Sequence, residues 1–165
     1  TILSSPHPVV MARALKTSWR QRLDSWYFLT FQIPWLPERL ASVGDATLMA
    51  RAIRNTAQPG AFSEETMAEL RRGWADPAVL GAQIDWYRAM VRYPQKLPTD
   101  RIVRVPTRIL WGDGDTFLRA ELADQSLAFC PAGEVRRFPA FGHWLAHEGA
   151  DEVAASILRE RIPES

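Results

Sequence analysis

An acid and a base each follow a predicted strand. Asp115 comes just after the predicted strand 107–111, and His143 comes just after the predicted strand 134–138 and a short loop. Carboxyl ends of neighbouring parallel strands meet at one edge of an open α/β sheet, where ligands bind. A carboxylate there can accept a hydrogen bond from an imidazole, fix its tautomer and leave the other nitrogen as a general base. Taken separately, each residue would be more typical of a turn Asp or a helix-start His with no shared role. The ordered pair, each after its own strand, makes the two interpretations equal.

Other reactive side chains near this pair fit supporting roles. Asp113 is the rival for the acid role, but the spacing from the preceding Gly112 favours Asp115. His147 and Glu148 lie one turn beyond the candidate base, and we expect them to support its loop.

The sequence predicts no metal and no organic cofactor. His143 and His147 have the i, i+4 spacing that suits a metal on a helix, but no third ligand accompanies them. The single Cys130 excludes an internal disulfide and a cysteine metal cluster, and we expect an inert core thiol. His7 follows the first apolar run, where we expect a hinge or packing residue rather than a catalyst.

Composition excludes several partner classes. Twenty basic and nineteen acidic residues give a net charge of +1, which offers no electrostatic case for nucleic-acid or membrane binding. A hydrophobic fraction of 47% over 165 residues is enough for a real core. No apolar run approaches the roughly 20 residues that span a bilayer. The expected location is reducing and cytoplasmic.

Two kinds of secondary structure are expected, divided near Val105. The first part is predicted to be helical and the second part to alternate strands and helices, which is typical of a parallel sheet covered by helices. The chain also starts inside an apolar run that indicates a strand without neighbours, so we expect the C-terminal portion of something longer. The expected helices are 8–15, 26–31 (ending at the Pro-rich stretch 33–38), 45–55 with Asp45 as N-cap, 64–72 after the N-cap Ser63, 77–91 after Asp76, 120–129, and 143–162 with a break near Gly149.

These motifs resemble the α/β-hydrolase fold in the form found in soluble epoxide hydrolases. The resemblance implies a core strand at 1–5, a helical cap at 6–98 and the C-terminal part of the α/β-hydrolase core at 99–165. On this resemblance the N-terminal half of the fold is absent from the sequence. The similar segments are the strand and acid turn 105–115, the histidine loop 139–148, the strand end 4–8 that leads into the cap, and the two tyrosine-bearing cap segments 26–34 and 85–90.

The resemblance also implies roles for single residues. Asp115 would be the acid of a triad and His143 its base, while Tyr27 and Tyr87 would donate hydrogen bonds to an epoxide oxygen. The implied substrate is a small apolar epoxide, opened to a vicinal diol through an Asp ester. Their spacing alone favours core aromatic residues, and it is the resemblance that gives the two tyrosines a catalytic role. The residues implied to line an apolar pocket are Trp26, Phe31, Trp86 and Met90.

The 165 residues depart from the family pattern in one large respect. They contain no His-Gly dipeptide for an oxyanion loop, and a nucleophilic Asp elbow would lie before Thr1. We therefore expect the isolated chain to be inactive, and to self-associate through surface that the missing core would cover. Two alternatives stay open. One is a haloalkane dehalogenase-like or other α/β hydrolase, in which Trp26 and Trp86 would donate N–H hydrogen bonds to the halide, and the other is a non-catalytic truncated fragment.

Overall fold

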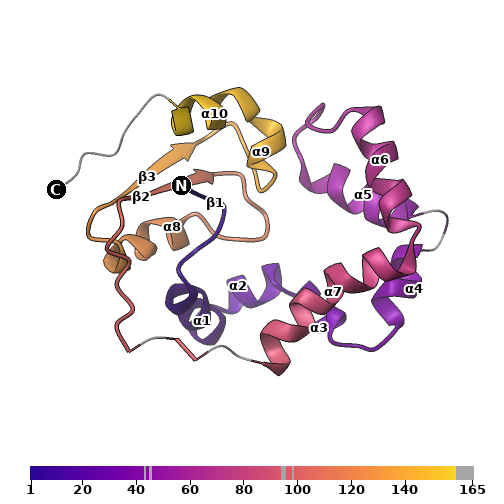
Figure 1. Cartoon of the computed structure of the whole chain (residues 1–165), viewed down its shortest axis with the longest axis horizontal. Coiled ribbons are helices and arrows are strands. Elements are labelled where there is room, and N and C mark those ends of the chain that lie inside the picture. The colour runs from indigo at the N-terminus through magenta and orange to yellow at the C-terminus, as the bar shows by residue number, and fades with distance from the viewer. Residues whose placement is uncertain (43, 45, 94–95, 98, 159–165) are drawn as a thin grey trace. The chain divides into compact units, whose positions relative to one another are not determined.

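The computed structural model describes residues 1–42, 44, 46–93, 96–97 and 99–158 (Figure 1). It divides into two compact units, a sheet unit of Thr1–Asp24 with Pro98–Ser165 and a helical unit of Ser25–Leu97. The first two helices group with the sheet unit, although residues 6–98 were expected to form one cap, and that cap assignment stays a prediction. None of the helices in the described ranges is both long and apolar enough to cross a membrane.

The sheet unit is built on three parallel strands. β1 (Ile2–Leu3), β2 (Thr107–Gly112) and β3 (Gly133–Phe138) pair in the order β1-β2-β3, with Ile2 opposite Ile109 and Trp111 opposite Arg137. The prediction of parallel strands with intervening helices is confirmed. The carboxyl ends of β2 and β3 lie side by side, so the segments that follow them start at the same edge.

Helices cover both faces of this sheet, because successive side chains of β2 point to opposite sides. Ile109 and Trp111 pack against α1 and α8, whereas Leu110 packs with residues of α9 and α10. Figure 1 shows these helices on the two sides of the sheet. The described helices of this unit are α1 (Pro8–Thr17), α2 (Trp19–Asp24), α8 (Glu121–Ser126) with the 3₁₀ turn Leu127–Phe129, α9 (Leu145–Glu148) and α10 (Ala150–Leu158).

His7 fixes the start of α1. Its Nδ1 accepts a hydrogen bond from the Val9 N–H at 3.3 Å, and its Nε2 donates to the Arg101 carbonyl oxygen at 3.1 Å. The ring stacks on Phe129 with centroids 4.3 Å apart. Burial lowers the pKa of His7, in keeping with a neutral ring that serves as an N-cap and packing group.

The helical unit contains five described helices, and two of its three predicted caps, Ser63 and Asp76, are confirmed. The Ser63 hydroxyl accepts from the Thr66 N–H at 3.1 Å, and the Asp76 carboxylate accepts from the Ala78 N–H at 2.8 Å. The expected cap Asp45 lies outside the described residues. The helices are α3 (Tyr27–Phe31), α4 (Leu36–Ser42), α5 (Thr47–Thr56), α6 (Glu64–Trp74) and α7 (Pro77–Arg92).

Two helices were not predicted. α2 was missed, and α4 begins inside the stretch 33–38 that was expected to be only a break. Pro37 is the second residue of α4, in the first turn, where a missing N–H costs no intrahelical hydrogen bond. The expected helix 143–162 begins at Leu145 and has its expected break at Gly149, which separates α9 from α10. Its expected end lies beyond the described residues.

Arg88 ties α7 to the corner between α3 and α4. Its buried guanidinium donates to the carbonyl oxygens of Phe31 at 2.9 Å and Ile33 at 3.0 Å, and pairs with Glu38 at 2.5 Å and Asp85 at 2.9 Å. The hydrogen bond from Arg88 holds the pKa of Glu38 below its usual value. The residue before Arg88 is Tyr87, so this cluster also sets where that tyrosine lies relative to α3.

Replacing Arg88 with Met is expected to destabilise the helical unit by about 3 kcal/mol, because Glu38 and two carbonyl oxygens lose a buried partner. Hydrogen exchange of the α7 amides measures this as a fall in the free energy of local opening. Arg92→Met, at the exposed end of the same helix, is the matched control and should change that free energy by less than about 0.5 kcal/mol. Equal protection in the two variants would contradict the role given to Arg88.

Candidate active site

The structure brings Asp115 and His143 together at the carboxyl edge of the sheet. Oδ2 of Asp115 lies 2.8 Å from Nδ1 of His143. Oδ1 of the same carboxylate accepts from the N–H groups of Phe117 at 2.8 Å and Leu118 at 2.9 Å. The Asp115 side chain is only 1% exposed, whereas that of His143 is 26% exposed. An ionised carboxylate only accepts, so it holds the proton on Nδ1 and leaves Nε2 of His143 as the acceptor nitrogen.

Two glycines let the acid turn and the histidine loop meet backbone to backbone. A Cβ at Gly112 would lie 2.6 Å from the carbonyl oxygen of Phe141 and closer still to that of Gly142, so no side chain fits there. The Gly114 N–H donates to the same Phe141 carbonyl oxygen at 2.9 Å. The two segments that carry the acid and the base are therefore held in direct contact.

Asp113, the rival for the acid role, forms an ion pair with Arg137. Its carboxylate lies 2.6 Å from Nε of Arg137 on β3. The same guanidinium also reaches Asp124 at 3.1 Å and the Ala120 carbonyl oxygen at 2.9 Å, at α8. Asp113 thus anchors the acid turn to β3 and α8, while Asp115 is the carboxylate that contacts His143. The glycine spacing in the sequence favoured the same residue.

Gln21 of α2 supports the segment after the acid turn, and sequence reasoning missed it. This side chain is 1% exposed. Its Nε2 donates to the Phe117 carbonyl oxygen at 2.7 Å, and its Oε1 accepts from the Arg119 N–H at 3.2 Å. Nothing in the local sequence marks a glutamine in a short helix as the partner of a loop about a hundred residues away.

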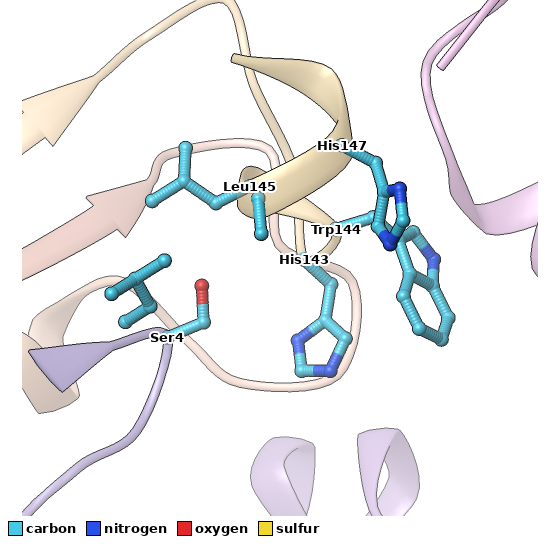
Figure 2. A pocket seen from close by; sticks show the side chains of 7 residues that line it. Ser4, His143, Trp144, Leu145 and His147 are labelled. Atoms are coloured by element: carbon cyan, nitrogen blue, oxygen red, sulfur yellow. The ribbon is translucent and has the colours of Figure 1, made fainter. Parts of the chain in front are cut away.

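A cavity of about 300 Å³ lies beside His143, between the end of β1 and α9. Figure 2 shows Ser4 at the end of β1 with its hydroxyl directed toward α9, and His143 and Trp144 on the other side. Oγ of Ser4 is buried without a hydrogen-bond partner in the described structure, and its backbone has a strained φ of 43°. The described residues form no cluster of three His, Cys, Asp or Glu side chains that could hold a metal.

The helical unit brings the two candidate tyrosines together. The rings of Tyr27 on α3 and Tyr87 on α7 lie edge to face with centroids 5.9 Å apart, and Phe31 contacts Tyr87 at 5.0 Å. Burial raises the pKa of Tyr87 above its usual value, so this phenol keeps its proton and remains a donor. Their catalytic role stays a prediction.

The expected pocket residues are mostly exposed in this unit. Trp26 is 61% exposed, Trp86 72% and Met90 45%, while Phe31 is half-buried against the tyrosines. Their role as pocket lining stays a prediction.

Gly112→Ala is expected to destabilise the sheet unit by about 3 kcal/mol or more, because its Cβ would overlap the backbone of the histidine loop. Gly81→Ala in α7 is the matched control, since nothing lies within 4 Å of a Cβ there. That control should stabilise its helix by up to about 1 kcal/mol. Thermal melting compares the two variants, and a Gly112→Ala chain as stable as the wild type would refute the close approach.

No protein-family model matches the chain. The chain is 32% identical over 156 residues to the AB hydrolase superfamily protein YfhM of Bacillus subtilis, which covers 94% of this chain and 54% of that protein. It is 28% identical over 152 residues to Epoxide hydrolase 2 of Caenorhabditis elegans, which covers 89% of this chain and 42% of that protein. The chain thus spans about half the length of the curated relatives it matches.

Solved structures give the same picture of the fold. An epoxide hydrolase from Bacillus megaterium, in complex with an inhibitor, matches with a TM-score of 0.78 at 20% identity, over 94% of this chain and 57% of that one. A structure from work on epoxide hydrolases in metagenomes from hot environments matches with a TM-score of 0.76 at 24% identity, over 94% of this chain and 56% of that one. With the parallel sheet and its helices, these matches show that the chain has part of the α/β-hydrolase fold and is similar in sequence to epoxide hydrolases and other AB hydrolases.

Proposed function

We propose that this chain supplies the water-activating pair and the epoxide-polarising phenols of an epoxide hydrolase. The observation that carries the proposal is the contact between Asp115 and His143, in which a buried carboxylate holds an imidazole by Nδ1. A neutral imidazole held in this way can act as a general base at Nε2.

Ring opening is the step that we assign to the tyrosines. A carboxylate attacks one epoxide carbon, the bond from that carbon to oxygen breaks, and an ester forms. The departing oxygen gains negative charge, and a phenol of Tyr27 or Tyr87 gives it a hydrogen bond and then a proton. Two adjacent phenols suit this step because one oxygen can accept hydrogen bonds from both.

Ester hydrolysis is the step that we assign to the acid–base pair. Nε2 of His143 takes a proton from water, and the water oxygen attacks the ester carbonyl carbon. The tetrahedral intermediate collapses to the free carboxylate and a vicinal diol, and the proton taken up by His143 returns to the tyrosinate that ring opening left. Asp115 stabilises the imidazolium that forms in this step and holds the ring in its orientation.

The tyrosines favour an epoxide over a haloalkane substrate. Halide release would need N–H donors directed at the leaving group, and the candidate donors Trp26 and Trp86 are both more than half exposed in the helical unit. Tyr27 and Tyr87 instead contact each other. The attacking carboxylate is assigned to none of the 165 residues, which hold no His-Gly dipeptide either.

The experiment is an assay of diol formation from a small aryl epoxide by the longest natural polypeptide that contains this chain. Tyr27→Phe and Tyr87→Phe should each slow ring opening by roughly 100-fold, the usual loss for one oxyanion donor. Tyr93→Phe, at a 76% exposed tyrosine, is the matched control and should leave the rate unchanged. His143→Gln should let the ester accumulate, which mass spectrometry detects as protein plus one epoxide.

Three results would overturn the proposal. An unchanged rate in the Tyr27→Phe/Tyr87→Phe double variant would remove the epoxide assignment. Halide release from a haloalkane without diol formation would favour a dehalogenase. No turnover and no ester with either substrate would favour a non-catalytic protein.

A further inference from the structure

The loop that carries His143 is also held on a second side, by the junction of α9 and α10. The Glu148 carboxylate, at the end of α9, accepts a hydrogen bond from the Gly142 N–H. A hydrogen bond from a backbone N–H to an ionised carboxylate is stronger than one between neutral groups. Glu148 therefore contacts the residue directly before the candidate base.

Gly149 completes this junction. A Cβ at Gly149 would overlap the ring of Phe141, lying 2.6 Å from its Cδ2 atom. The absence of a side chain at this position is what lets the Phe141 ring reach the α9–α10 junction. That ring also packs on Phe138, with centroids 5.9 Å apart, in the core cluster on this face of the sheet.

The dipeptide Phe141–Gly142 is thus clamped from two directions. The acid turn contacts it through Gly112 and Gly114, and the α9–α10 junction contacts it through Glu148 and Gly149. His143 follows at once, so the backbone from which its ring projects is fixed on both sides. If either side were released, the loop could rotate and draw the ring away from the acid.

We propose that Glu148 is a positioning residue that keeps Nδ1 of His143 on the Asp115 carboxylate. Its importance for catalysis rests on the proposed function, but its effect on the ring does not. Glu148 would act through the backbone: its carboxylate holds the Gly142 N–H, and through it the direction of the imidazole. A positioning role is more specific than a general stabilising role, because it predicts that replacing Glu148 changes the tautomer of His143.

The test is nitrogen-15 NMR of the imidazole rings in the full 165-residue chain, where three histidines make assignment simple. The wild type should show the Nδ1–H tautomer of His143 and a slowly exchanging Nδ1 proton. Glu148→Ala should turn this into a mixture of tautomers and lose the proton signal. Glu148→Gln, whose amide oxygen still accepts the Gly142 N–H, should keep both features. Glu152→Ala removes an exposed carboxylate from the neighbouring helix, and it should also keep the Nδ1–H tautomer and the slowly exchanging proton.

Two results would overturn the proposal. The first is a Glu148→Ala chain whose His143 signals match the wild type, and the second is a Glu152→Ala chain that loses them equally. If Glu148→Ala fails to fold, Glu148→Asp decides, since it withdraws the carboxylate by one methylene and keeps the charge. Its His143 signals should shift toward the mixture, and unchanged signals would refute the role. Because no epoxide is involved, this outcome is independent of the turnover assay.

Discussion

The backbone contact between the acid turn and the histidine loop is the constraint on which the candidate site depends. β2 and β3 end side by side in a parallel register, and the segments that leave them would collide if Gly112 carried a side chain. Since it carries none, the Phe141 carbonyl oxygen reaches the Gly114 N–H and Asp115 reaches His143. An acid–base pair assembled in this way loses little side-chain entropy when it forms, because the backbone has already set the distance between the two residues.

Polar side chains hold the segments on either side of the acid and the base. Arg137 holds Asp113, Gln21 holds the segment after Asp115, and Glu148 holds the residue before His143. In the helical unit, Arg88 has a comparable role, since it joins α7 to the α3–α4 corner beside Tyr87. Arg137, Gln21 and Arg88 bond to partners in other parts of the sequence, whereas Glu148 bonds to Gly142, six residues before it. Each of these contacts restricts a loop or a helix pair.

Local sequence patterns predicted the parts of this structure that local physics determines. The strand–turn–helix order after residue 105 and the caps Ser63 and Asp76 follow from nearby residues. The glycine spacing favoured Asp115 over Asp113, and Asp115 is the carboxylate that contacts His143, while its catalytic role stays a prediction. α2 and α4 were missed, because α2 is a short helix and α4 begins inside a Pro-rich stretch. The partners of Gln21 and Arg88 were also out of reach, since they depend on contacts across more than fifty residues.

The most direct test of the account is the tautomer of His143 in Asp115→Asn, read by nitrogen-15 NMR against the wild type. Oδ1 of Asp115 already accepts two backbone N–H groups, so the asparagine oxygen should take that place and turn its NH₂ toward Nδ1. The account predicts that the proton moves from Nδ1 in the wild type to Nε2 in the variant. The same tautomer in both proteins would contradict a hydrogen-bonded Asp115–His143 pair.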